Sequence, residues 1–163
     1  MRLLIHDLPE KWDEILRPKA EEVFRADGNY APCQGCFGCW TKHPAQCFMK
    51  DKLQTICQKF GKADELIIVT ENHYGSYSAA IKNVMDRTIG LSTPFMTYRK
   101  GLTHHTLRYG KKKKLTVYVY GDMTEDEKNT FRLLAECNAV NFGYREMELH
   151  FAASAEELEG VMA

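Results

Sequence analysis

The stretch ELIIVTENHYGSYSAAIKNVMDR, residues 65–87, contains a buried strand, a short loop and a helix in direct succession. Its first seven residues are nearly continuously apolar and rich in β-branched side chains, which is typical of a strand covered on both faces. Turn-forming Asn, Gly and Ser residues follow, and Ser78 is of a type that favours the start of a helix. A strand that leads through a short loop into a helix predicts a β–α unit of a parallel sheet.

The rest of the chain continues this alternation of strands and helices. The predicted strands are residues 2–6, 20–26, 65–71, 114–121 and 145–151, of which the second is weak and could instead be the end of a helix. The predicted helices are residues 9–18, 51–61, 78–90 and 124–143, and a short one after Ser154. We therefore expect an α/β fold with a three-layer, doubly wound, five-stranded parallel sheet in the order 2-1-3-4-5, in one domain over residues 1–163. Residues 91–110 are predicted to be a long irregular loop.

Composition narrows the classes of partner. The formal net charge is zero, which removes the usual electrostatic case for nucleic acid or an anionic membrane as a partner. No apolar run approaches the roughly 18 residues of a membrane span, and MRLLIH is too short an apolar run for a signal peptide. We expect a cytoplasmic protein, where thiols stay reduced and clustered cysteines more often indicate metal or redox chemistry than a structural disulfide.

The segment CQGCFGCWTKHPAQC, residues 33–47, concentrates four of the six cysteines of the chain. Cys33, Cys36, Cys39 and Cys47 have the spacing of a run that wraps a cubane iron–sulfur cluster, and the two glycines between them let the backbone curl. A tetrahedral zinc site, a redox disulfide and reduced, packed thiols are the alternatives. Cys57 and Cys137 lie on apolar helix faces and are predicted to be core residues.

Ligands of doubly wound sheets bind beyond the carboxyl ends of the strands, near the point where the strand order reverses. That edge would carry the loops at residues 7–11, 71–78 and 121–124. We expect the cysteine loop, which follows the second strand, to lie at the same edge.

Three segments together resemble the flavodoxin-like NAD(P)H-dependent FMN reductase family, and within it the iron–sulfur flavoproteins. They are residues 33–47, residues 67–87 and VYVYGDMTEDEKN, residues 117–129. The resemblance implies a flavodoxin-like fold, FMN as cofactor and electron transfer from NAD(P)H through flavin to a small-molecule or protein acceptor. The cysteine loop would hold an iron–sulfur cluster or shape the pocket. It also implies a homodimer or higher homo-oligomer, with the long loop near the interface.

The resemblance also implies which residues surround the flavin. One wall of the ring site would be His73, Tyr74, Gly75, Ser76, Tyr77 and Ser78, with backbone amides facing the polar edge of the ring. The other wall would be Tyr120, Gly121 and Asp122.

The first loop departs from the family pattern. Members carry a Gly-Ser-Pro-Arg type of loop there, which cradles the flavin phosphate, whereas this chain has HDLPEKW, residues 6–12. Asp7 and Glu10 place negative charge where phosphate charge would sit, and Lys11 is the residue that could offset it. The alternative function is therefore a non-enzymatic protein of this fold that has lost FMN and uses the cysteine loop to bind zinc or a partner.

Overall fold

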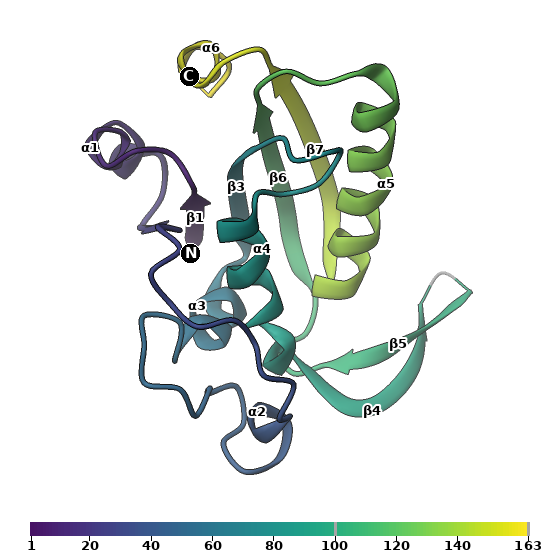
Figure 1. The fold of residues 1–163 in the computed structure, drawn as a ribbon. Helices are drawn as coiled ribbons and strands as arrows, with labels where there is room; N and C mark the ends of the chain where they lie inside the picture. Colours follow the sequence, from purple (N-terminus) through teal and green to yellow (C-terminus); the bar gives the residue numbers. More distant parts are fainter. Residues whose placement is uncertain (100, 163) are drawn as a thin grey trace.

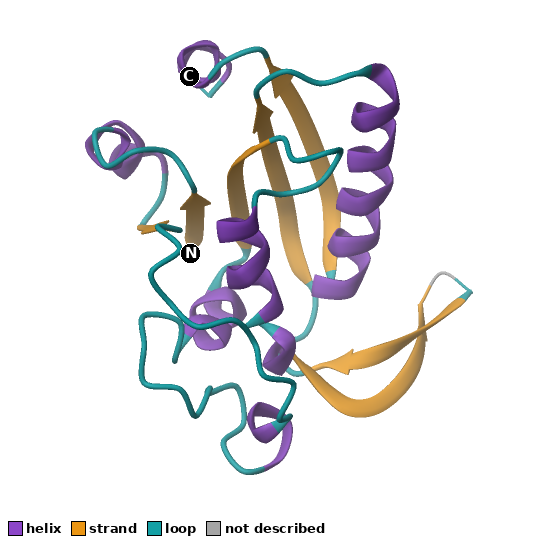
Figure 2. Cartoon of the chain, in the orientation of Figure 1, coloured by secondary structure: helices purple, strands orange, loops and turns teal. Residues whose placement is uncertain are grey.

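The computed structural model describes residues 1–99 and 101–162, and its centre is a five-stranded parallel sheet (Figures 1 and 2). The strand order is β2-β1-β3-β6-β7, which confirms the predicted order of 2-1-3-4-5. The strands are β1 (Arg2–His6), β2 (Glu22–Arg25), β3 (Glu65–Glu71), β6 (Lys112–Tyr120) and β7 (Tyr144–Ala152). The ambiguous segment at residues 20–26 is thus a strand, and it pairs in parallel with β1.

The parallel register places apolar side chains side by side across the sheet. Leu3 pairs with Leu66, and Leu66 pairs with Leu115, and all three side chains are fully buried. They belong to the larger core, where one face of the sheet packs against three helices. These helices are α3 (Ile56–Lys62), α4 (Ala79–Asp86) and α5 (Glu125–Phe142).

The opposite face has a smaller core that includes Leu4, Trp12, Val69 and Leu158. The helices that cover it are α1 (Trp12–Leu16), extended by a 3₁₀ turn η1 (Arg17–Lys19), and α6 (Ala155–Val161). Helices therefore cover both faces, and the doubly wound architecture is confirmed. Among the described residues, no helix is long and apolar enough to cross a membrane.

The predicted helix boundaries have the expected chemistry. The side chain of Ser78 accepts a hydrogen bond from the amide of Ile81 and caps α4. Thr124 and Glu127 form a complete capping box at the start of α5, and Gly143 ends that helix in the left-handed conformation with φ of 82°. The caps at Ser78 and Thr124 thus begin α4 and α5 at the carboxyl edge of the sheet, and Gly143 ends α5 at the opposite edge.

The prediction of an irregular loop at residues 91–110 is wrong for most of that segment. After a 3₁₀ turn η2 (Ile89–Leu91), the chain forms an antiparallel hairpin of β4 (Ser92–Arg99) and β5 (Leu102–Leu107). The hairpin extends from the body of the molecule in Figure 1. Arg99 ties it to α5 by donating to the carbonyl of Val140 at 2.8 Å. Much of its apolar surface is exposed, so the buried/exposed alternation that signals a strand is weak here.

Candidate functional site

Two predicted loops meet at the carboxyl edge of the sheet. The backbone amide of Asn72 donates to the carbonyl of Tyr120 at 2.8 Å, and its side-chain amide donates to the carbonyl of Asp122 at 3.0 Å. The loop after β3 and the loop after β6 therefore lie side by side, as their positions after neighbouring strands of a parallel sheet require. The structure brings residues 73–78 and 120–122 together.

The loop after β3 is closed by a tight turn. The amides of His73 and Ser76 each donate to the carbonyl of the other residue, at 2.9 and 3.0 Å. Tyr74 and Gly75 occupy the middle of the turn with φ of 55° and 78°, and the Tyr74 side chain is 92% exposed. A Cβ on Gly75 would lie 2.9 Å from the carbonyl oxygen of Glu127, so glycine permits the close packing of this loop on α5. Because the amides of His73, Gly75 and Ser76 are already bonded within the loop, few of its amides remain for a ligand.

Tyr77 and Ser78 are held inside the structure. The Tyr77 ring packs edge-on against Phe131, with ring centroids 4.9 Å apart, and its hydroxyl accepts a hydrogen bond from Asn138 at 3.2 Å. Burial raises the pKa of Tyr77 to about 12. The amide of Ser78 donates to the hydroxyl of Thr70 at 3.0 Å. The side chains that this loop presents to a ligand are therefore His73 and Tyr74.

Asp7 occupies the end of β1, where the family carries its phosphate-binding loop. Its carboxylate accepts hydrogen bonds from the amide of Glu71 at 3.0 Å, the hydroxyl of Thr70 at 3.2 Å and the hydroxyl of Tyr120 at 3.0 Å. Burial, together with the charge of Asp7, raises the pKa of Tyr120. The groups that could have bound an anion here are thus satisfied by a carboxylate of the chain itself.

Lys11 follows the carboxyl end of β1 and immediately precedes α1. Its ammonium lies 4.0 Å from a carboxylate oxygen of Glu156 in α6 and 6.0 Å from the centroid of the Trp12 ring. The following helix α1 has only five residues, so its dipole is weak. The residues present at the end of β1 therefore do not fit a flavin phosphate in the family's manner.

The four clustered cysteines gather around one small cavity. Cys33, Cys36, Cys39 and Cys47 line it, with Phe37 and Phe48 beside them and Arg87 and Ile89 behind. The described residues contain no group of three or more His, Cys, Asp or Glu arranged for a single metal ion. Four thiols are a donor set that suits an iron–sulfur cluster as well as a tetrahedral zinc ion.

The cysteine cavity does not lie at the carboxyl edge of the sheet, and that part of the sequence prediction is wrong. The cavity contacts Arg87 and Ile89, which follow the C-terminal end of α4, whereas the loop at residues 73–78 precedes its N-terminal end. The eight residues of α4 separate the two by about 12 Å. The chain after β2 runs along α4, where the hydroxyl of Tyr30 donates to the carbonyl of Ala80, and delivers the cysteines to the far end (α2, Gly38–Thr41, in Figure 1).

Burial distinguishes the thiols. Cys57 is buried in the core and donates to the carbonyl of Arg87 at 3.2 Å, and burial raises its pKa to about 12. Burial also raises the pKa of Cys39. Cys36 is exposed, and so is Cys137, which the sequence had placed in the core. The prediction for Cys57 is thus confirmed and the one for Cys137 is wrong.

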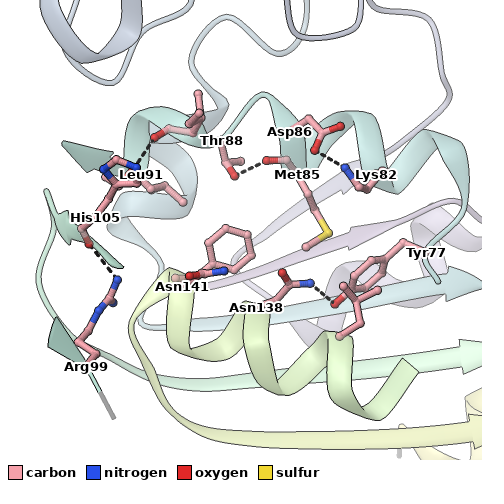
Figure 3. Close-up of a pocket in the computed structure, with 14 residues that line it drawn as sticks. Tyr77, Lys82, Met85, Asp86, Thr88, Leu91, Arg99, His105, Asn138 and Asn141 are labelled. Atoms are coloured by element: carbon pink, nitrogen blue, oxygen red, sulfur yellow. Dashed lines mark hydrogen bonds and ion pairs between the residues drawn. The ribbon is translucent and has the colours of Figure 1, made fainter. Parts of the chain in front are cut away.

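A larger pocket of about 350 Å³ lies between α4, α5 and the β4–β5 hairpin (Figure 3). Its walls mix apolar side chains such as Met85 with the amides of Asn138 and Asn141. Tyr77 lines the end near the carboxyl edge, and Ile89 is shared with the wall of the cysteine cavity. The sequence did not signal this pocket, because one of its walls is the hairpin.

Comparison with known proteins identifies the family. The profile of the family described as NADPH-dependent FMN reductase matches residues 19–103, which is more than half of the chain. The chain belongs to this family. The resemblance to this family that the sequence indicated is thereby confirmed. FMN and a reduced nicotinamide are the cofactors associated with the family.

Two curated relatives are iron–sulfur flavoproteins. The one from Archaeoglobus fulgidus is 29% identical over 70 residues, 43% of this chain and 33% of the relative. The one from Methanocaldococcus jannaschii is 32% identical over 82 residues, 50% of this chain and 42% of the relative. The matches thus span less than half the length of these two iron–sulfur flavoproteins.

Solved structures show the same fold. An FMN-dependent NADH-azoreductase from Bacillus anthracis, in complex with FMN, aligns over 99% of this chain and 96% of its own with a TM-score of 0.59 at 14% identity. An NAD(P)H:quinone oxidoreductase from Methanothermobacter marburgensis aligns over 99% of this chain and 92% of its own with a TM-score of 0.60 at 12% identity. At such low identity the likeness supports the flavodoxin-like fold of this family member and nothing finer.

Proposed function

We propose that this chain is an FMN-dependent oxidoreductase that passes electrons from NAD(P)H to an acceptor, and that Cys33, Cys36, Cys39 and Cys47 hold an iron–sulfur cluster. The observation that carries the proposal is the gathering of these four thiols around one cavity in a chain of the FMN reductase family. Thiolates are the ligands of such clusters, and Phe37 and Phe48 would shield the cluster from water.

The flavin ring would bind against residues 73–78 and 120–122. The exposed ring of Tyr74 supplies a stacking surface and His73 a hydrogen-bonding group, while Tyr77 and Ser78 support the loop from inside. FMN supplies hydride and single-electron chemistry when bound, and the chain positions it. Because Asp7 holds a negative charge at the end of β1, we propose that the phosphate lies away from the family's position.

An absorbance spectrum of protein purified without oxygen tests both cofactors. The expected result is a spectrum with flavin bands and a broad iron–sulfur shoulder in the visible region, together with iron and sulfide in the protein. Cys36→Ser should remove the iron and the shoulder and leave the fold intact. Cys137→Ser is the matched control, because Cys137 is also an exposed cysteine but does not line the cavity. Iron retained by the Cys36 variant contradicts the cluster.

The second candidate function is a non-enzymatic protein that has lost FMN and uses the cysteine loop to bind zinc or a partner. The satisfied carboxylate of Asp7 favours it, because no phosphate cradle is visible in that loop. Titration of FMN with the protein separates the two functions. Quenching of flavin fluorescence at micromolar protein supports the reductase, and unchanged fluorescence with bound zinc supports the alternative.

We further propose that the protein works in the cytoplasm as a homodimer and passes electrons to a small-molecule or protein acceptor. Four thiols with no disulfide among them suit a reducing compartment. On the hairpin, the exposed fractions of Phe95, Tyr98 and Leu102 are between 64% and 79%. Large apolar side chains grouped on a surface in this way are typical of a protein–protein interface. A second copy of this chain is the partner we propose for that surface.

A further inference from the structure

Arg87 is buried against the cysteine cavity. Its side chain is 1% exposed, and among the described residues that line the cavity it alone carries a charge. A guanidinium is buried at this depth only when its charge and its N–H groups are compensated.

One side of the guanidinium is fully engaged. Nη1 and Nη2 donate to the two carboxylate oxygens of Asp51 at 2.9 Å each, and Nη1 also donates to the carbonyl of Ala31 at 2.7 Å. Asp51 in turn accepts the amides of Ala31 and Leu53 at 3.2 and 3.0 Å. This bidentate pair fixes the plane of the guanidinium and leaves it no freedom to rotate.

The Nε–H of Arg87 has no partner among the described residues, although the atom is buried. A buried donor is rarely left without an acceptor. Cys47 lines the same cavity and offers a sulfur as the acceptor for this N–H. Hydrogen bonds to the sulfurs are among the features by which a protein sets the reduction potential of an iron–sulfur cluster.

We propose that Arg87 is a positioning residue that orients the Cys47 thiolate through its free N–H and places a fixed positive charge beside the iron–sulfur cluster, so that the cluster is reduced at a higher potential. The inference rests on the cluster of the proposed function. A cluster with four thiolates carries net negative charge, and reduction adds one more electron, so a cation held at its edge stabilises the reduced form more than the oxidised form.

The test is the reduction potential of the cluster in the full chain, loaded anaerobically with iron and sulfide and titrated by absorbance. Arg87→Met combined with Asp51→Asn removes the ion pair without leaving either charge buried alone. We expect its potential to fall by at least the equivalent of a tenfold change in the equilibrium constant, about 59 mV for one electron. Asp51→Asn alone leaves the cation without its counter-charge, and its potential should rise.

Arg25→Met is the matched control for loss of an arginine charge. Arg25 lies on β2, pairs with Glu10 and Asp13, and does not line the cysteine cavity. Its variant should therefore keep the wild-type reduction potential. Opposite shifts in the two Asp51 variants support the inference, because a purely structural role would not change sign. Unchanged potentials with intact clusters overturn the inference alone. A wild-type protein that takes up no cluster overturns the proposed cluster as well. If the double variant does not fold, Asp51→Asn decides by itself.

Discussion

The carboxylate of Asp7 lies at the end of β1 and accepts hydrogen bonds from Glu71, Thr70 and Tyr120. We predict that Asp7→Asn raises the affinity for FMN about tenfold, or ~1.4 kcal/mol, because it removes the negative charge that keeps the phosphate away from the end of β1. The measurement is the dissociation constant from flavin fluorescence. Glu10→Gln is the matched control, since Glu10 lies in the same loop with an 82% exposed side chain. Equal gains in both variants would show that only overall charge matters.

His6 makes stability depend on pH. It is fully buried at the end of β1, and burial lowers its pKa below the ordinary value of 6.5. The unfolded chain therefore binds a proton that the folded chain rejects, so the free energy of unfolding falls as pH drops below 6.5, by up to ~1.4 kcal/mol per pH unit. Urea unfolding at pH 7.5 and 5.5 measures this slope.

The nearby carboxylate of Asp13 acts against this effect. It lies 3.3 Å from Nε2 of His6 and raises the pKa of the histidine, though less than burial lowers it. His6→Gln should flatten the slope, whereas His43→Gln, at an exposed position, should not. A slope that His6→Gln leaves unchanged would assign the acid sensitivity to other groups.

At the scale of elements, α5 depends on its capping box. Thr124 accepts the amide of Glu127 at 3.2 Å, and the Glu127 carboxylate accepts the amide of Thr124 at 2.8 Å. We predict that Thr124→Ala lowers the free energy of unfolding by ~1 kcal/mol, measured by urea titration. Ser154→Ala in α6 is the comparison. It removes a similar cap at 3.3 Å, but from a seven-residue helix at the chain end. A larger loss of unfolding free energy for Ser154→Ala than for Thr124→Ala would contradict the prediction that the α5 cap contributes more to stability.

The elements that could be predicted are those specified by local sequence. Ser78, Thr124 and Gly143 mark helix ends through contacts within a few residues, and every strand except the weak second one was clear from the local sequence. The hairpin at residues 92–107 could not be predicted, because its stability comes from Arg99 reaching α5 and from pairing across the turn. These contacts have no local signal.

The candidate site was predictable only where its arrangement follows from the order of the strands. Loops after neighbouring parallel strands must meet, so the contact between residues 72 and 120 follows from strand order. The path of the cysteine loop depends on contacts of Tyr30 with Ala80 in α4 and of Ala31 with Arg87 directly after it. No pattern in residues 26–47 predicts these contacts. Tyr77 was placed at the ligand and lies in the core, because a loop tyrosine next to a helix cap can serve either purpose.

On the scale of the whole molecule, the two proposed redox centres lie at opposite ends of α4, about 12 Å apart along its axis. The pocket between α4, α5 and the hairpin joins these ends, since Tyr77 and Ile89 line it at either limit. We expect a second copy docked through the hairpin to cover the wall of this pocket that the hairpin forms.

The last prediction tests that surface. Phe95→Ser combined with Tyr98→Ser should convert the proposed dimer to a monomer in light scattering after size-exclusion chromatography, because it removes the two most exposed aromatic rings of β4. The free energy of unfolding of the monomer should change little, since neither side chain is buried in one chain. Leu133→Ser is the matched control, at an apolar residue of α5 that is 65% exposed, and should leave the dimer intact. A dimer that survives the double change would exclude the hairpin as the interface, and a dimer that dissociates only with Leu133→Ser would place the interface on α5.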